Sequence, residues 1–405
     1  MKKKIFKLVA FMMFAFSICA ISQTLVDAAS VYYGDVNSDG KIDTLDAVIL
    51  MQNLAGYSNL QFDEKKADLN KDGKVDTLDA VLLKQYLAGY AIELPKADVS
   101  DDTPVGQHGK LSVSGVNLVD ESGAKFQLKG VSTHGIAWFP QYVNKDAFKT
   151  LRDDWKCNVI RLAMYTAEYA GYCEGGSQSD LKNLVDNGVK YATELGMYAI
   201  VDWHILQDQN PNKYKSDAIS FFDEMSAKYA NNNNVIYEIC NEPNSGTSWA
   251  DIKSYADDVI KTIRNNDKDA IIIVGTPQWC QLPMDAKDNM IDDKNTMYAV
   301  HYYATTHGDY VRNNVTSALE NNIPIFISEC SICAADGCGY IDYESAEKWM
   351  TLIKDNNLSF VSWNLSNKAE TSSLIASDCS KTSDWSESEL SDTGKYFRNI
   401  FRDLN

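Results

Sequence analysis

The chain has 405 residues, a formal net charge of −18 and a hydrophobic share of 45%. This length accommodates two or three domains, and the hydrophobic share is sufficient for a sizeable core. The acidic balance argues against nucleic acid as a partner, because proteins that bind phosphate backbones carry basic patches. A neutral polymer or a cation is the better expectation.

The first 28 residues have the pattern of a secretory signal peptide. Four lysines precede an apolar run from Leu8 to Ile21, and small residues around Ala28 offer a cleavage site. A membrane anchor is the alternative, but the run is short for a span and no other segment is long and apolar enough. We therefore expect residues 1–28 to be removed, the protein to be secreted, and no membrane association.

Residues 29–95 contain a duplicated loop. Each copy places oxygen side chains at loop positions 1, 3, 5, 9 and 12, with Gly at position 6 and a backbone carbonyl at position 7. This is the pattern of a calcium loop, since a hard cation prefers oxygen ligands and the Gly permits the sharp turn. Two complete copies disfavour an acidic turn that only imitates such a site, and they predict two structural Ca2+ ions. The expected ligands are Asp35, Asn37, Asp39, Lys41 (carbonyl), Asp43 and Asp46, then Asp68, Asn70, Asp72, Lys74 (carbonyl), Asp76 and Asp79.

A helical segment is expected after each loop, over residues 47–57 and 80–90. Apolar residues recur there at helical spacing, and Gly56 and Gly89 stand where a helix commonly ends. No helical pattern precedes the first loop, so the unit is a repeated loop–helix. The polar stretch 96–107 then carries Pro and Gly without periodicity and predicts a short flexible linker.

From residue 108 to residue 405, short apolar β-rich runs alternate with helical stretches, which is typical of parallel β/α units. Eight such runs predict a (β/α)8 barrel, closed at its bottom by a small hairpin after Lys110. A doubly wound open sheet is the alternative, but no Gly-rich phosphate turn follows the first strand. The expected strands are Phe126–Val131, Val159–Ala163, Tyr198–Trp203, Val235–Ile239, Ile271–Gly275, Met297–His301, Ile325–Ser328 and Phe360–Asn364.

The C-terminal ends of these strands carry acidic, amide, histidine and tryptophan side chains, which a barrel gathers at one mouth. Glu242 and Glu329 arrive from different strands, and two carboxylates across a glycosidic bond are the usual means of hydrolysing it. Arg161 beside one of them would keep that carboxylate ionised. Taken singly, Glu242 could be a helix cap, each His a core residue and each Trp a packing residue. Taken together, they favour a cleft that cleaves sugars.

Eight cysteines remain after residue 28, and three of them, Cys330, Cys333 and Cys338, lie close together. A disulfide among these three or buried free thiols are both better expectations than zinc, because no second Cys/His cluster is present. The pairing of the eight stays open.

The duplicated loop–helix resembles a type I dockerin, the module that attaches enzymes to scaffold proteins through cohesin domains. The resemblance covers residues 31–95 and implies a cohesin partner and folding coupled to calcium. In dockerins, loop positions 10 and 11 help to choose the cohesin; here they are Thr44-Leu45 and Thr77-Leu78. Identical pairs in both halves imply binding in two orientations related by a half-turn.

Residues 108–405 resemble the family 5 glycoside hydrolases, in particular their bacterial endoglucanase branch. The resemblance rests on motifs that occur in the family's order: Thr133–Trp138, Leu151–Trp155, Arg161–Tyr165, Val201–His204, Ile236–Pro243, Ile272–Gly275, His301–Ala304, Ser328-Glu329 and Trp363–Ser372. One departure is Cys330-Ser331, where relatives have an aromatic residue and Gly, and it puts the packing behind Glu329 in doubt.

This second resemblance implies a role for each matching residue. Glu242 corresponds to the general acid/base, Glu329 to the nucleophile and Asn241 to the residue that binds the 2-hydroxyl of the cleaved unit. Arg161 and Tyr303 correspond to the partners that hold the nucleophile ionised and aimed. The remaining correspondences are substrate contacts in and around the cleavage subsite: His301, His204, Trp363, Trp138, Tyr165, His134, Lys368, Glu370 and Trp279 on the leaving-group side.

The implied activity is that of an endo-β-1,4-glucanase acting on cellulose or a related β-glucan by a retaining mechanism. No cofactor is expected for catalysis. Mixed-linkage glucan, xyloglucan and mannan remain alternative substrates, and a non-catalytic glycan-binding subunit remains an alternative of another class. The presence of both glutamates, Arg161 and Asn241 argues against that last alternative.

Overall fold

The computed structural model describes residues 33–37, 39, 41–90, 92, 94 and 102–404. The chain divides into two compact units, Met1–Ala97 and Asp98–Asn405, and each is treated by itself. The expected signal peptide, residues 1–28, lies outside the described residues, as does the first half of the expected linker, residues 96–101. Within the described ranges, no helix combines the length and the apolar character needed to cross a membrane.

The N-terminal unit is built from two equivalent helices, α2 (Thr44–Leu54) and α4 (Thr77–Leu87), with the short α3 (Glu64–Ala67) between them. Each long helix begins with a capping box, Asp43 with Asp46 in α2 and Asp76 with Asp79 in α4. The side chain of each Asp in a pair accepts from the backbone N–H of the other. Gly56 and Gly89 follow the helix ends in the left-handed conformation (φ 83° and 77°), as the sequence predicts. A small apolar core that includes Leu50 and Leu83 holds the two halves together.

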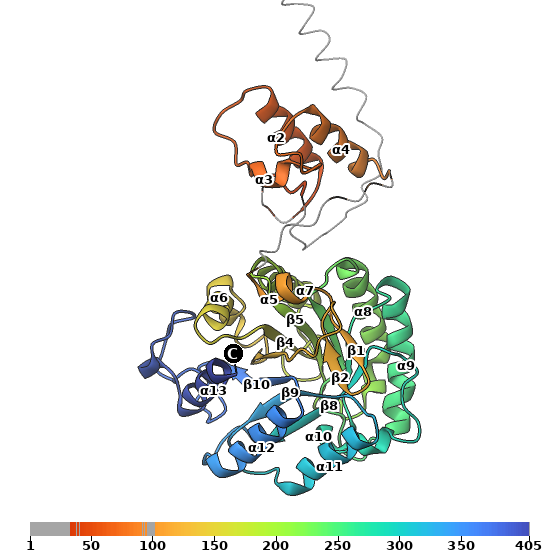
Figure 1. Cartoon of the computed structure of the whole chain (residues 1–405), viewed down its shortest axis with the longest axis vertical. Coiled ribbons are helices and arrows are strands. Elements are labelled where there is room, and N and C mark those ends of the chain that lie inside the picture. Colours follow the sequence, from red (N-terminus) through yellow and green to blue (C-terminus); the bar gives the residue numbers. More distant parts are fainter. Residues whose placement is uncertain are drawn as a thin grey trace, which may run out of the picture. The chain divides into compact units, whose positions relative to one another are not determined.

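The C-terminal unit is a closed barrel of eight parallel strands in the order β10-β3-β4-β5-β6-β7-β8-β9, with helices around the outside (Figure 1). This confirms the predicted (β/α)8 fold and excludes the open sheet. The strands are β3 (Lys129–Thr133), β4 (Val159–Tyr165), β5 (Tyr198–His204), β6 (Val235–Cys240), β7 (Ile272–Val274), β8 (Thr296–Tyr303), β9 (Ile325–Ser331) and β10 (Phe360–Leu365).

Amphipathic helices connect the strands and cover the barrel (Figure 1). Short helical turns directly precede three of the longer helices. The longer helices are α6 (Lys145–Asp153), α7 (Gln178–Glu194), α8 (Lys215–Tyr229), α9 (Trp249–Asn266), α11 (Asp309–Glu320), α12 (Tyr343–Asp355) and α13 (Asp392–Asp403). The short turns are η2 (Pro140–Tyr142), η3 (Pro211–Tyr214), α10 (Pro277–Cys280), η4 (Pro283–Ala286) and η5 (Glu387–Glu389).

The first barrel strand begins three residues later than the sequence predicts. Phe126 instead donates its N–H to the carbonyl of Leu118, on the antiparallel hairpin formed by β1 (Ser112–Ser114) and β2 (Asn117–Val119). The start of the predicted strand Phe126–Val131 therefore pairs with the hairpin and its end with the barrel, and the apolar pattern alone does not show where one sheet gives way to the other. Leu111 and Leu118 of the hairpin region belong to the core cluster that fills the barrel, in agreement with the predicted bottom closure.

The predicted linker is wrong over residues 104–107. These residues form helix α5 (Pro104–His108), which starts with a Thr103 cap and a Pro at its first position. The N–H of Val105 donates to the carbonyl of Gly196 at 2.9 Å, and the Val105 side chain is buried in the barrel core. Five residues are too few for helical periodicity to be read from sequence.

The barrel interior changes character along its axis. Apolar side chains such as Ile200, Ile236 and Phe326 fill its lower part. Toward the C-terminal ends of the strands, Arg161, Asp202 and Glu238 point inward and are completely buried (0% exposed). Because buried charges are costly unless paired, this switch marks the part of the barrel built for chemistry rather than stability.

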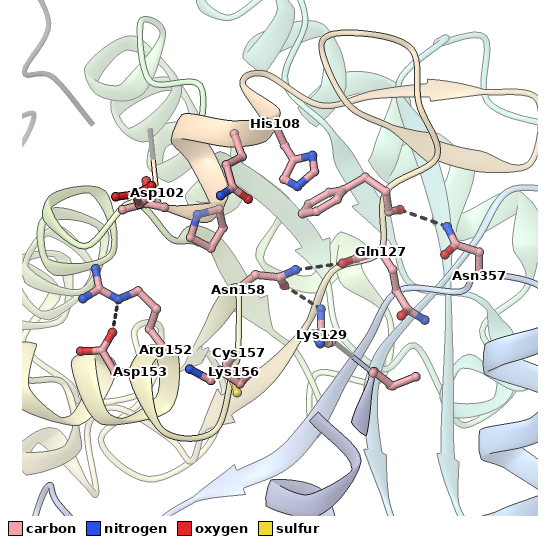
Figure 2. A pocket seen from close by; sticks show the side chains of 15 residues that line it. Asp102, His108, Gln127, Lys129, Arg152, Asp153, Lys156, Cys157, Asn158 and Asn357 are labelled. Atoms are coloured by element: carbon pink, nitrogen blue, oxygen red, sulfur yellow. Dashed lines mark hydrogen bonds and ion pairs between the residues drawn. The ribbon is translucent and has the colours of Figure 1, made fainter. Parts of the chain in front are cut away.

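A pocket of about 770 Å³ lies at the N-terminal ends of the strands, at the end of the barrel away from these buried charges (Figure 2). Its polar groups bond one another: Asn158 donates to the carbonyl of Gln127 at 2.9 Å and accepts from the N–H of Lys129 at 2.8 Å. The Lys129 ammonium donates to the carbonyl of Phe401 at 3.0 Å. These contacts stabilise the base of the barrel.

Candidate active site

A cleft of about 730 Å³ opens at the C-terminal ends of the strands. It is lined by groups that the sequence singles out and that come from separate β/α units. Those lining residues are His134, Trp138, Tyr165, His204, Glu242, Trp279, Tyr303, Glu329, Trp363, Lys368 and Glu370. Arg161, Asn241 and His301 lie directly beneath, buried to 1% exposure or less.

Arg161 on β4 is the centre of the site. Its Nε and Nη2 donate to the two oxygens of Glu238 at 2.7 and 3.2 Å, its Nη1 donates to Glu329 at 3.2 Å, and its Nη2 lies 3.0 Å from Asp202. Burial alone would lower the pKa of Arg161, but the three carboxylates outweigh it and raise that pKa. The guanidinium is therefore a permanent positive charge beneath Glu329.

Asn241, at the end of β6, is held at both ends of its amide. Its Oδ1 accepts from Arg161 Nη2 at 2.6 Å, so its nitrogen faces His204 Nε2 at 3.2 Å and the carbonyl of Ile205 at 3.1 Å. His204 must therefore accept at Nε2 and donate from Nδ1 to Asp202, 2.6 Å away. Burial lowers the pKa of His204 to about 3, so this ring is neutral.

Glu242 follows Asn241 and is 12% exposed to the cleft. One of its oxygens lies 2.8 Å from His301 Nδ1 on β8, and His301 Nε2 lies 3.0 Å from Ser328 Oγ. Ser328 in turn donates to Glu238 at 2.8 Å. Burial alone would lower the pKa of His301, but Glu238, Glu242 and Glu329 outweigh it and raise the pKa to about 9. His301 is therefore protonated at neutral pH, so that its Nδ1–H donates to Glu242 and its Nε2–H donates to Ser328.

Glu329 on β9 receives two donors and faces Glu242. The Tyr303 hydroxyl donates to one oxygen at 2.7 Å, while Arg161 donates to the other. One carboxylate oxygen of Glu242, one of Glu329 and a ring nitrogen of His301 lie within 4.8 Å of one another. Glu242 lies beside the imidazole of His301, which can exchange a proton, whereas Glu329 lies beside the guanidinium of Arg161, which cannot. The two carboxyl groups therefore have the different surroundings that an acid and a nucleophile need.

An aromatic and charged wall forms one side of the cleft. Trp363 stacks on His204 with ring centres 5.2 Å apart, and Trp138 contacts Tyr165 at 4.5 Å. Farther along, Lys368 Nζ lies 2.5 Å from Glu370 and 3.3 Å from His134 Nε2. Burial lowers the pKa of His134 to about 3, so it is a neutral hydrogen-bonding group. Flat rings beside fixed polar groups suit pyranose faces and hydroxyls.

The other side is shaped by an unusual backbone turn. Gln278, Trp279 and Cys280 all have positive φ (60°, 54° and 58°), a conformation that costs an L-residue about 1 kcal/mol or more. Two bonds to the Glu242-bearing segment hold it there: Trp279 N–H donates to the carbonyl of Pro243 at 3.0 Å, and the Cys280 thiol donates to the carbonyl of Asn241 at 2.8 Å. Trp279 is left 36% exposed toward the cleft.

Comparison with known proteins agrees with this geometry. Residues 119–369 match the family model for cellulase (glycosyl hydrolase family 5), and residues 33–88 match that for the dockerin type I domain. The chain is 48% identical to Endoglucanase A of Butyrivibrio fibrisolvens over 307 residues, which cover 75% of this chain and 71% of that protein. This chain belongs to glycosyl hydrolase family 5 and carries a type I dockerin domain.

Other relatives of the family 5 domain extend the comparison. The domain is 46% identical to Endoglucanase 5 of Pectobacterium carotovorum subsp. carotovorum, over 74% of this chain and 59% of that protein. It superposes on the catalytic domain of Thermobifida fusca endoglucanase Cel5A with a TM-score of 0.69 and 36% identity, covering 74% of this chain and 99% of that one. The protein is thus an enzyme of the glycoside hydrolase class.

The dockerin loops have the donor chemistry that calcium requires. Asp46 is fully buried at the end of the first loop, with its oxygens directed at the N–H groups of Asn37 and Asp43. Burial and the nearby charges of Asp35 and Asp39 raise the pKa of Asp46 to about 6. Asp79 repeats these contacts in the second loop. A loop that offers only oxygen ligands and brings several negative charges together suits a hard divalent cation.

All eight cysteines of the family 5 unit are free thiols. The alternative of a disulfide among Cys330, Cys333 and Cys338 is therefore not realised. Cys330 behind Glu329 is fully buried and donates to the carbonyl of Val361 at 3.4 Å. The departure from the family pattern at this position is accommodated by packing.

Sequence reasoning gave no role to Glu238, Asp202, Ser328 or Cys280, although the structure places all four in the bonded network of the site. Glu238 and Asp202 left a signal: each is an acidic residue inside an apolar strand run, where an unpaired charge is costly. Ser328 and Cys280 left none, because small polar residues are common in strands and turns.

Proposed function

We propose that the protein is a secreted endo-β-1,4-glucanase that cleaves internal bonds of cellulose or a related β-glucan with retention of anomeric configuration. The observation that carries the proposal is the pair of Glu242 and Glu329 across the cleft, with one oxygen of each within 4.8 Å of the other. Retaining enzymes have carboxyl groups roughly 5–5.5 Å apart, whereas inverting enzymes need room for a water between them. Relatives named endoglucanases support the substrate class.

In the first step, an oxygen of Glu329 attacks the anomeric carbon and the bond from that carbon to the glycosidic oxygen breaks. Glu242 gives its proton to the departing oxygen and becomes a carboxylate, which His301 Nδ1 stabilises from 2.8 Å. Arg161 and the Tyr303 hydroxyl each donate to one Glu329 oxygen and hold the carboxyl group in position for the attack. The product is a glycosyl ester on Glu329 and a released sugar chain.

In the second step, the Glu242 carboxylate takes a proton from a water molecule whose oxygen attacks the same anomeric carbon. The ester bond breaks, Glu329 leaves as a carboxylate, and Glu242 is protonated again. Two inversions give overall retention. The bond from Asn241 to His204 is the longer of its amide contacts, and a sugar 2-hydroxyl entering beside Trp363 would join it in the transition state.

The Glu242→Gln and Glu329→Gln variants test the mechanism. Both should lose release of reducing sugar from soluble β-glucan. Glu242→Gln should still form a glycosyl-enzyme from a dinitrophenyl glycoside, because that leaving group needs no proton, whereas Glu329→Gln should not. Glu344→Gln, at an exposed site on α12, is the control. Unchanged turnover of β-glucan in either variant would refute the assignment, and an inverted first product in NMR would refute retention.

The substrate within the β-glucan class follows from a panel of soluble polysaccharides. Carboxymethyl cellulose, mixed-linkage glucan, xyloglucan and mannan differ in linkage, branching and the 2-hydroxyl orientation that Asn241 would meet. We expect the highest kcat/KM on unbranched β-1,4-glucan. A preference for mannan would overturn the proposed substrate while leaving the two-carboxylate mechanism intact.

The dockerin supports attachment to a cohesin domain of a cellulosome scaffold outside the cell. The exposed residues Leu45 and Val48 on α2 and Leu78 and Val81 on α4 (42–50% exposed) occupy equivalent positions in the two repeats. Two structural Ca2+ ions would be held by the loop oxygens and the carbonyls of Lys41 and Lys74. Secretion rests on the N-terminal signal pattern.

A further inference from the structure

The cleft is lined by a second exposed aromatic residue besides Trp279. Tyr310, in the first turn of α11, lines the same cleft and is 54% exposed. Gln278 and Gln281 line the same cleft. A large exposed aromatic ring inside a binding cleft is a candidate ligand contact, since ligand sites are lined mainly by hydrophobic and aromatic side chains.

The Tyr310 ring is fixed rather than free. Its hydroxyl donates to Gln281 Oε1 at 2.9 Å, and the backbone carbonyl of Gln281 accepts from the Asn314 side chain, one turn farther along α11, at 2.9 Å. The turn that carries Trp279 is thereby tied to the helix that carries Tyr310. A ring that is already oriented loses little entropy when a ligand stacks on it.

The surroundings of Tyr310 suit a neutral ligand. His307 lies edge-on to the ring with centres 6.4 Å apart, and its Nδ1 accepts from the N–H of Tyr303 at 2.8 Å. Burial lowers the pKa of His307 to about 4, so this neighbour is uncharged at neutral pH. An uncharged aromatic face beside amide groups matches a hexopyranose, which has apolar C–H faces and hydroxyl edges.

We propose that Tyr310, fixed by Gln281, is the platform for the second sugar on the leaving-group side, one unit beyond the sugar that Trp279 contacts. The inference rests on the proposed hydrolysis of β-glucan and adds the extent of chain that the enzyme grips. It follows that the enzyme favours cuts that leave at least two glucosyl units on the leaving-group side. Tyr310 is a specificity-determining residue in this scheme and takes no part in bond cleavage.

The test compares Tyr310→Ala and Tyr310→Phe on cellopentaose labelled with 18O at its reducing end. For Tyr310→Ala we expect kcat/KM to fall roughly 5- to 10-fold, as for loss of one stacking contact, with cleavage shifting toward release of single glucose units. Tyr310→Phe keeps the ring and should stay within about twofold of wild type. Hydrolysis of an aryl cellotrioside, whose leaving group ends at the first position, should be unchanged in both.

A matched control is Tyr343→Ala, an equally exposed tyrosine (50%) on α12 that does not line the cleft. Wild-type rates and cleavage positions in Tyr310→Ala would overturn the inference. So would an equal loss on the aryl cellotrioside, because that would mean a structural role. If the wild-type enzyme did not hydrolyse cellopentaose at all, the proposed function would fail instead, so the two failures are distinguishable.

Discussion

Replacing Glu238 with Gln tests whether the negative charge of Glu238 stabilises the buried network under the cleft. Glu238 is fully buried and accepts three hydrogen bonds, two from Arg161 and one from Ser328. Burial alone would raise its pKa, but Arg161 and the His301 side of the network outweigh it and lower the pKa from 4.5 to about 2. Glu238 is therefore ionised throughout the physiological pH range.

Two independent arguments give the same loss of unfolding free energy for Glu238→Gln. A pKa lowered from 4.5 to about 2 corresponds to roughly 3 kcal/mol favouring the charged form, at about 1.4 kcal/mol per pKa unit. Gln keeps one acceptor but turns an N–H group toward the guanidinium, and each lost charge-assisted bond costs about 1.5–3 kcal/mol. Asp202 and Glu329 still neutralise Arg161, so the cost should not exceed that of a fully broken buried pair, about 3–5 kcal/mol.

The assay is urea unfolding at pH 7 followed by tryptophan fluorescence. All eight tryptophans lie at or after Trp138, so the signal reports on the barrel alone. We expect the unfolding free energy to fall by about 3 kcal/mol with an unchanged m-value. Glu344→Gln, whose side chain is 83% exposed, should change it by less than about 0.5 kcal/mol.

The pH dependence of this difference provides the decisive check. A lowered carboxyl pKa contributes stability that is present above pH 4.5 and lost as the pH falls toward 2, since the unfolded chain takes up the proton first. The gap between wild type and Glu238→Gln should therefore narrow across that range. A gap below about 0.5 kcal/mol at pH 7, or one that is constant down to the acid limit of folding, would refute the ionic account.

Three further outcomes are expected. The pKa of His301 is raised to about 9, so the folded state keeps a proton that the unfolded chain releases from about pH 6.5, and barrel stability should fall as the pH rises from 6.5 to 9. His301→Ala should flatten this slope of stability against pH in thermal unfolding, and an unchanged slope would contradict the assignment. Cys280→Ala should lower kcat/KM on cellopentaose roughly 10-fold but leave a dinitrophenyl glycoside within about twofold, because the thiol holds the carbonyl of Asn241 next to the acid Glu242. Cys280→Ser should restore most of the loss, Cys157→Ala should have no such selectivity, and equal losses on both substrates would argue for a general packing effect. EDTA should weaken binding of a cohesin domain and loosen the dockerin as seen by circular dichroism, and a complex that persists without calcium would contradict the loop assignment.

Much of the architecture was predictable because it depends on local patterns. Eight apolar strand runs separated by helical stretches leave few arrangements other than the barrel, and parallel strands gather their C-terminal residues at one mouth. Glu242 and Glu329 could thus be paired without knowing any distance. The errors fall where local patterns are short or shared, as in helix α5 and in the apolar run at Phe126 that also pairs with the hairpin.

The sequence by itself determined the two-module organisation, the barrel and the meeting of Glu242 and Glu329 at one mouth, because period, turn chemistry and motif order are local properties of the chain. The sequence also named Arg161 as the cation beside one carboxylate, but only the tertiary structure showed which further groups join both carboxylates in one network. Arg161 reaches Glu329, Glu238 and Asp202 from three other strands, and Glu242 connects through His301 and Ser328 to Glu238. Such contacts depend on the stagger between strands, which hydrophobic patterns do not encode. The same holds for the tie between Tyr310 and Gln281, which joins residues from separate β/α units at one end of the cleft.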